Sequence, residues 1–181
     1  ILSPPVASRV YLYSNIAAYE AGRITSKSLP AFSNQQGDFP EIKLPDSLTL
    51  ANAHYAAAWA AMLTANRFIF SEAQLADSMQ AILHNAWPAL QPVVKAQSIS
   101  WAKMVSDSVW AWSKKDNYRE TRKLRRYSYG KADSMWKPTP PGYIDAVEPH
   151  WGKMKTTVIA PLEAYRPALP MPFGTRSTST F

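Results

Sequence analysis

Three histidines are the first residues to test for chemistry, because histidine is the side chain that most often moves protons or binds metals near neutral pH. They are His54, His84 and His150, and their positions do not match the H-E-x-x-H pattern of a zinc site. Cysteine is absent, there is no Gly-rich phosphate loop, and no order of Ser, His and Asp supports a catalytic triad. We expect His54, on an alanine-rich stretch, to be packed and hydrogen-bonded. The sequence therefore predicts no catalytic, cofactor-binding or metal-binding residue in this chain.

Two further charged residues stand out in the first stretch of the chain. Arg9 and Glu20 are eleven residues apart, which is about three turns of a helix and brings both to nearly the same face. We expect each to make a structural polar contact with a neighbouring element. An active-site arginine is the alternative interpretation of Arg9.

Basic residues are concentrated in one part of the chain. Nine basic and three acidic residues lie between Lys114 and Lys137, so this stretch carries +6 of the formal net charge of +7. Three tyrosines, at positions 118, 127 and 129, are interleaved with the basic residues, as stacking of nucleic-acid bases would require. The patch 114–131 is consistent with an anionic partner such as nucleic acid, anionic lipid or phosphate. It is also typical of a solvated helix face, with cations near a helix C-terminus.

Helices must position these residues, and the punctuation of the sequence predicts where they lie. Pro4 and Pro5 suit a first helical turn, and Gly22 suits the position just past a helix end. Asp46 is a predicted N-cap, and Ser71 with Gln74 has the form of a capping box. The predicted helices cover residues 4–21, 46–70, 71–87 and 93–125. No stretch predicts a strand, so the expected fold class is an all-α helical bundle.

The segments between and after these helices are rich in proline. Residues 23–45 predict a long surface connection, and residues 136–155 predict an ordered proline and tryptophan connection that packs Trp136 and Trp151 against helices. Residues 161–181 predict an extended C-terminal arm. At 46% hydrophobic residues, residues 1–181 are expected to form a single all-α domain or an N-terminal half-domain. No apolar run reaches the roughly 18 residues that a membrane helix requires.

Three segments resemble a known family. The stretch from Trp136 follows W-x-P-T-x-P-x-Y-x-x-A-x-x-P-x-W-G-K, and the opening contains SPPVASRVYLYSNIAAYEA. Both resemble the helical proteins related to vanadium-dependent haloperoxidases, in the type 2 phosphatidic acid phosphatase superfamily. The tail, with Arg166-Pro167, Pro172-Phe173 and 179–181, is similar to the loop that leads into that family's catalytic half. The resemblance implies the N-terminal helical half of such a protein.

The resemblance also implies a vanadate or phosphate site, whose motifs are absent from this chain. Family members place a lysine seven positions before an Arg-Pro, but the position seven before Arg166 is Ile159. The family's P-S-G-H block is missing, and the one Ser-Arg, at Ser8-Arg9, has Asn15 where the family has a histidine. The oxyanion is therefore expected to bind in a C-terminal half that is not present in these 181 residues.

Two functional hypotheses follow. In the first, the chain is the N-terminal structural half of a protein that oxidises halide with peroxide, or hydrolyses phosphate esters, and its partner is the catalytic half, on the same or a separate polypeptide. Such proteins are commonly exported, so a periplasmic or extracellular location is expected. In the second, the chain is a stand-alone helical module that binds an anionic partner, such as nucleic acid, through patch 114–131. Between the two hypotheses, the catalytic half is the expected partner and nucleic acid is not. Alone, a half-protein should bind hydrophobic dyes or self-associate.

Overall fold

The computed structural model describes residues 2–26, 28–69, 72–132, 135–157, 159 and 162–168, and it is all-α over these ranges, without a strand. The side chains of residues 72, 74 and 84 are outside the description. The chain divides into two compact units, Ile1–Asp116 and Asn117–Phe181, which we call unit 1 and unit 2. The predicted all-α fold class is confirmed. That residues 1–181 form a single domain or half-domain stays a prediction.

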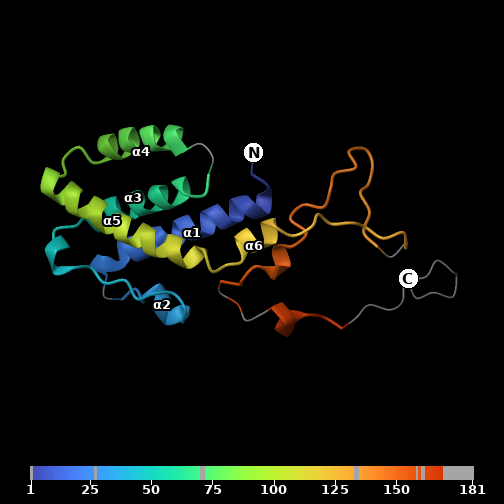
Figure 1. Ribbon diagram of the computed structural model, residues 1–181. Helices are drawn as coiled ribbons and strands as arrows, with labels where there is room; N and C mark the ends of the chain where they lie inside the picture. Colours follow the sequence, from blue (N-terminus) through green and yellow to red (C-terminus); the bar gives the residue numbers. More distant parts are fainter. Residues whose placement is uncertain are drawn as a thin grey trace. The chain divides into compact units, whose positions relative to one another are not determined.

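Helix α1, Pro4–Gly22, is the central helix of unit 1 and packs against both α3 and α5 (Figure 1). Two prolines occupy its first turn, where their missing N–H groups cost nothing. Its buried residues lie on more than one side, since two neighbouring helices cover it. They are Val6, Arg9, Val10, Tyr13, Ile16, Ala17, Glu20 and Ala21.

Helix α3, Ala53–Asn66, begins later than predicted. Asp46 starts only a short 3-10 turn, η2 (Asp46–Leu48), so the prediction of one helix over 46–70 is wrong at its start. Asn52 is the N-cap instead, because its side chain accepts a hydrogen bond of 3.0 Å from the N–H of Tyr55. The alanine-rich helix then approaches α1 closely: a Cβ at Gly22 would lie 3.3 Å from the Cβ of Ala57.

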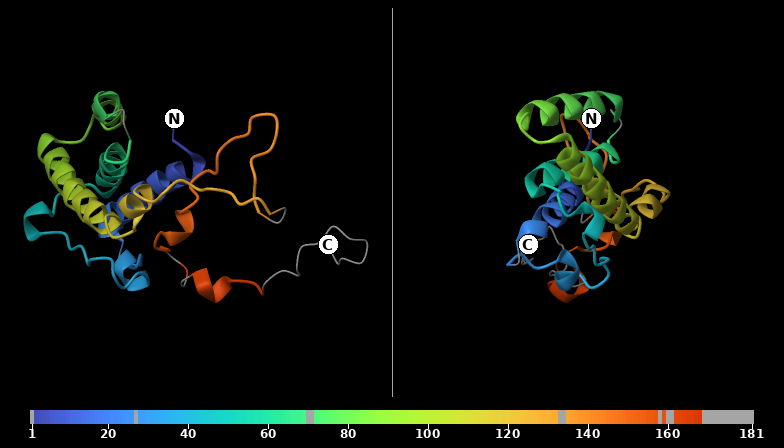
Figure 2. Two further views of the ribbon diagram at one scale, coloured as in Figure 1. Left: turned by 45° about the vertical axis from the view of Figure 1, so that its right-hand side comes forward. Right: turned by 90° about the vertical axis from the view of Figure 1, so that its left-hand side faces the viewer.

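Helices α4, Glu72–Ala86, and α5, Pro92–Ser113, complete the bundle, with α4 packed against α3 in both views of Figure 2. The predicted capping residue Ser71 and the side chain of Gln74 lie outside the described residues. Trp101 of α5 is fully buried, and its indole N–H donates a 3.0 Å hydrogen bond to the carbonyl of Ala21. Helix α5 is therefore fixed to the end of α1 by both packing and a hydrogen bond.

The prediction of one helix over 93–125 is wrong after residue 113, because α5 ends at Ser113. Asp116 turns its carboxylate into the protein, and Asn117 adopts a left-handed conformation with φ of 66°, which asparagine tolerates better than most residues. A separate short helix, α6 (Tyr118–Arg122), follows. A buried partner for Asp116, described below, outweighs the local helical preference.

The connection between α1 and α3 lies largely at the surface, as its polar composition predicts, but part of it joins the core. It contains η1 (Arg23–Thr25) and α2 (Phe32–Gln35), and it buries Phe39 and Ile42. The rings of Phe32 and Phe39 contact each other edge to face, and both pack on Trp112 of α5. This loop therefore closes one end of the hydrophobic core.

Unit 2 has little regular structure and no hydrophobic core among its described residues. Its elements are α6, η3 (Trp151–Lys153) and η4 (Leu162–Tyr165). The buried hydrophobic side chains all belong to unit 1. Trp151 packs on Tyr118 of α6, with centroids 6.3 Å apart, as expected, but Trp136 packs on Tyr127 of an extended segment instead of on a helix. Of the predicted arm 161–181, only residues 162–168 are described.

Candidate functional site

A buried ion pair joins α1 to Asp116, just after the end of α5. Arg9 Nε lies 2.7 Å from Asp116 Oδ2, and the Tyr13 hydroxyl donates a 2.8 Å hydrogen bond to the same oxygen. Both charged side chains are less than 10% exposed. The Arg9 guanidinium also lies 4.6 Å from the ring centroid of Phe68, which stacks on Tyr13. Arg9 is thus enclosed by a carboxylate and two aromatic rings.

Tyr13 shows how strongly this cluster depends on burial. Removal from water raises the pKa of Tyr13 above its ordinary value, and the neighbouring Asp116 carboxylate raises that pKa further. The hydroxyl therefore remains protonated and continues to donate to Asp116. Since every group in the cluster has a partner, the cluster is structural, as expected for Arg9, and offers no free group for catalysis.

Glu20 makes the second structural contact expected on α1. Its side chain is 1% exposed, and it accepts hydrogen bonds from Arg23 Nε at 2.9 Å and from the N–H of Phe32 at 2.6 Å. The backbone contact holds the start of α2 against α1. Glu20 therefore anchors the connection that closes the core.

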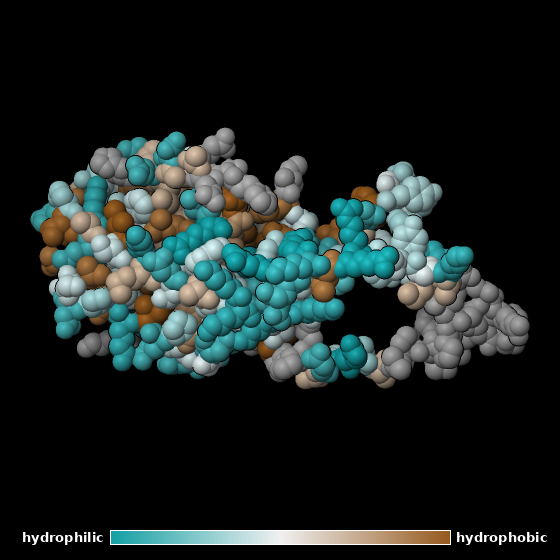
Figure 3. Space-filling model, in the orientation of Figure 1, coloured by the Kyte–Doolittle hydropathy of each residue, from teal (hydrophilic) through white to brown (hydrophobic). Residues whose placement is uncertain are grey.

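Unit 2 has a polar groove between α6 and the segment 145–151. Two adjoining cavities, of about 420 and 210 Å³, share four lining residues. These are Arg122, Arg126, Glu148 and Pro149. Hydrophilic side chains dominate the surface over α6 (Figure 3). The formal charges of the larger cavity balance, since two arginines and two acidic residues, Asp145 and Glu148, line it. It therefore lacks the excess positive charge that an oxyanion requires.

Arg122 holds this groove together. Its two terminal nitrogens lie 2.9 Å from the two carboxylate oxygens of Glu148, a bidentate pair. The Tyr118 hydroxyl accepts a further 2.8 Å hydrogen bond, and the guanidinium lies over the Tyr118 ring. Burial alone would lower the pKa of Arg122, but the hydrogen bonds to Glu148 and Tyr118 raise it above the ordinary value. Arg122 is consequently a permanent cation committed to a structural pair.

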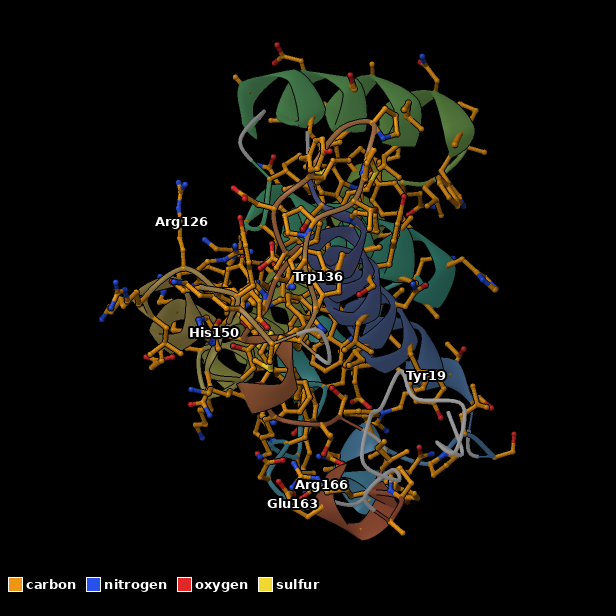
Figure 4. The ribbon with its side chains drawn as sticks, turned by 90° about the vertical axis from the view of Figure 1, so that its right-hand side faces the viewer. Tyr19, Arg126, Trp136, His150, Glu163 and Arg166 are labelled. Carbon is orange, nitrogen blue, oxygen red and sulfur yellow. The ribbon has the colours of Figure 1, made fainter. Side chains whose placement is uncertain are left out.

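The side chain of His150 is also engaged in a structural contact. Its Nε2 lies 2.7 Å from the backbone carbonyl of Arg125, which links the segment 145–151 to the residues after α6. Figure 4 shows the side chain of Arg126 extending away from the ribbon and from His150. The groove therefore combines a histidine and two arginines without directing them at one point, and it has no nucleophile paired with a base.

The remaining histidines form no site in the part of the chain that is described. His54 is exposed on α3, so the prediction that it is packed is wrong: the small alanines around it leave its face open. The side chain of His84 lies outside the described residues. Among those residues, no group of three or more His, Cys, Asp or Glu side chains could hold a metal ion, and no helix is long and apolar enough to cross a membrane.

A separate cavity, of about 500 Å³, lies in unit 1 between α3, α4 and α5. It is lined by Tyr55, Trp59, Gln80, Ala81, Lys95 and Ile99. Among the described residues the buried indole N–H of Trp59 has no hydrogen-bond partner. No serine, histidine or acidic side chain is among these lining residues.

The basic patch 114–131 is exposed, but its tyrosines are only partly available. Tyr118 is in contact with Arg122 and Trp151, and Tyr127 is in contact with Trp136. Tyr129, at 52% exposure, is the most open of the three. A stacking platform for several bases, as single-stranded nucleic acid requires, is therefore not formed by these rings.

The chain is all-α over its described residues, and a comparison with solved structures gives its class. The chain is similar to the crystal structure of a bacterial vanadium-dependent iodoperoxidase, with a TM-score of 0.88 and 33% sequence identity. The match covers 99% of this chain and 43% of that chain. No protein-family model and no curated protein matches. The chain is thus vanadium haloperoxidase-like, which confirms the resemblance found in its sequence.

Proposed function

We propose that this chain is the N-terminal structural half of a vanadium haloperoxidase-like protein, and that the catalytic half lies on a C-terminal polypeptide. The observation that carries the proposal is the match to the iodoperoxidase, which includes nearly all of this chain but less than half of the other. These 181 residues contain no P-S-G-H, no lysine seven positions before the Arg-Pro, and no histidine six positions after the arginine of the Ser-Arg. The missing motifs support the same division.

The groove at Arg122, among the described residues, does not fit vanadate. Its formal charges balance, and Arg122 and His150 are already engaged in structural contacts. We therefore assign the oxyanion site to the catalytic half, and to this chain the role of a helical wall that supports it. No step of the reaction is assigned to a residue described here.

For the complete protein we favour oxidation of halide by peroxide, and iodide is the first halide to test because the similar structure is an iodoperoxidase. Hydrolysis of phosphate esters at the same pocket is the alternative reaction. We further propose a periplasmic or extracellular location. That proposal rests on the family resemblance alone.

The first experiment is intact mass measurement and peptide mapping of the protein purified from its source. We expect peptides that continue beyond Phe181, or a second polypeptide, containing P-S-G-H. Iodide oxidation with peroxide should then depend on added vanadate, whereas the 181-residue chain alone should be inactive. A native protein without any P-S-G-H peptide would contradict the proposal.

The basic-module hypothesis predicts a different result for the isolated chain. If patch 114–131 binds nucleic acid, affinity for a single-stranded oligonucleotide should fall steeply as salt rises from 50 to 200 mM. We expect no measurable binding at about 150 mM salt, because the tyrosine rings are largely engaged. Tight, salt-sensitive binding would instead favour the module.

A further inference from the structure

Three of the four most exposed large apolar side chains described in unit 2 lie in one short stretch, residues 143–147. Tyr143 is 62% exposed, Ile144 is 72% exposed and Val147 is 55% exposed. Three large apolar groups within five residues, all open to solvent, are unusual for a segment that is otherwise ordered. The stretch therefore requires an explanation other than a local core.

Both ends of this stretch are held by specific contacts. Tyr143 has a φ of 44°, in the left-handed region, and its N–H donates a 3.0 Å hydrogen bond to the carbonyl of Thr139. Glu148 has a φ of 49°, and its carboxylate is clamped by Arg122. Non-glycine residues adopt such backbone angles only when their surroundings impose them.

These two observations belong together. The contacts at Tyr143 and Glu148 fix the backbone at either end of the stretch. The side chains of Ile144 and Val147 between them are more than half exposed, although Val147 also lines the groove of Arg122. Fixing the loop before binding reduces the conformational entropy lost when a partner covers it. A preorganised loop with apolar tips is the usual form of an anchor that enters a pocket on a partner.

We propose that residues 143–147 form a docking loop whose apolar side chains bind the catalytic half of the protein. This proposal rests on the proposed function. The similar iodoperoxidase matches 99% of this chain, the docking loop included, and has more than half of its own chain outside the match. Because the described part of unit 2 buries no hydrophobic side chain, the absent half is the occupant that would supply the missing apolar contacts.

The loop also indicates the chemistry of the surface that receives it. Ile144 and Val147 require an apolar pocket. Asp145 lies between them and lines the groove of Arg122, and no cation pairs with it among the described residues. We therefore expect the receiving surface of the catalytic half to be apolar, with a lysine or arginine beside the pocket.

The test uses the double variant Ile144→Ser/Val147→Ser in the 181-residue chain, which leaves the strained Tyr143 unchanged. Its partner is the P-S-G-H polypeptide found by peptide mapping, expressed separately, with binding measured by calorimetry. We expect the Kd to rise by about a hundredfold, as for loss of two interface anchors. Leu50→Ser in unit 1, at 54% exposure, is the matched control and should change the Kd less than about threefold.

A second measurement locates the contact directly. Amide hydrogen exchange at residues 143–147 should slow when the catalytic half is added to the wild-type chain, and should not slow in the double variant. The unfolding transition of unit 1 should be the same in all three proteins, because every altered side chain is exposed.

The outcomes separate the two proposals. If the wild-type chain binds the catalytic half and the double variant binds equally well, the docking loop is wrong and the proposed function stands. If the wild-type chain does not bind a P-S-G-H polypeptide at all, both proposals are wrong. If sedimentation shows a dimer of this chain that the double variant abolishes, the loop's occupant is a second copy and the docking proposal is overturned.

Discussion

Unit 1 and unit 2 are stabilised in different ways. Unit 1 contains every buried hydrophobic side chain of the described residues, including the fully buried Trp101, Val105 and Val109. Unit 2 is held by polar contacts, chiefly Arg122 with Glu148 and His150 with the carbonyl of Arg125. Burial of apolar surface is the main favourable term in folding, whereas exposed ion pairs contribute about 1 kcal/mol or less. The hydrophobic core of unit 1 can therefore stabilise its fold without a partner, whereas unit 2 would gain most of its stability from contacts with a partner.

Two matched tryptophans give the largest test of this difference. Trp101→Ala should lower the free energy of unfolding of unit 1 by about 3–5 kcal/mol, because it opens a cavity in the core and removes the hydrogen bond to Ala21. Trp136→Ala should cost less than about 1 kcal/mol, since Trp136 is 48% exposed and packs mainly on Tyr127. Urea unfolding followed by circular dichroism measures both values. Similar losses at the two sites would break the comparison.

The buried ion pair of unit 1 should also matter more than an exposed one. Asp116→Ala leaves Arg9 charged and buried without its carboxylate, so we expect a loss of about 3 kcal/mol or more. Asp107, which pairs with Arg67 and whose side chain is 53% exposed, provides the control. Asp107→Ala should cost within about 1 kcal/mol. Chemical unfolding of both variants and the wild type measures these losses. An Asp116 variant as stable as the Asp107 variant would contradict the role of Asp116 as a buried anchor.

Alkaline pH should weaken unit 1 through Tyr13. Because the folded protein raises the pKa of Tyr13, the hydroxyl stabilises unit 1 fully below the ordinary tyrosine pKa of about 10, and this contribution is lost as pH rises above that value. Tyr13→Phe should cost about 1–2 kcal/mol near neutral pH, and the difference from the wild type should shrink above pH 10 or so. Tyr11→Phe is the control, since Tyr11 is 70% exposed. If the difference in free energy of unfolding between Tyr13→Phe and the wild type stays constant with pH, the pKa of Tyr13 is not raised in the folded protein.

The smallest effect is expected in unit 2. Glu148→Gln weakens the bidentate pair with Arg122, which contributes about 1 kcal/mol or less at this exposure. Amide exchange at His150 and Trp151 should become up to about fivefold faster, while the unfolding midpoint of unit 1 stays unchanged. A shift of that midpoint would show that the two units do not unfold separately.

Local patterns in the sequence predicted much of the helical framework. Pro4-Pro5 and Gly22 mark the ends of α1, and the alanine-rich run predicts α3, because proline, glycine and alanine act on the backbone of their own neighbourhood. The same local reasoning misplaced the start of α3, since Asp46 and Asn52 are both good caps and only the packing of the helix selects between them. The absence of family site motifs was likewise evident from residue order alone.

Contacts between distant residues were decided by the tertiary structure. Asp116 ends the long helix early because Arg9 and Tyr13, more than 100 residues earlier, bury its carboxylate. Phe39 becomes core because Trp112 of α5 receives it, although the residues around it are polar. The clamp between Arg122 and Glu148 joins the end of α6 to a segment without regular structure, 26 residues later. Sequence determined where helices form, because helix formation depends on neighbours along the chain. Which polar groups are buried and which apolar groups remain exposed was decided by packing, because burial depends on neighbours in space.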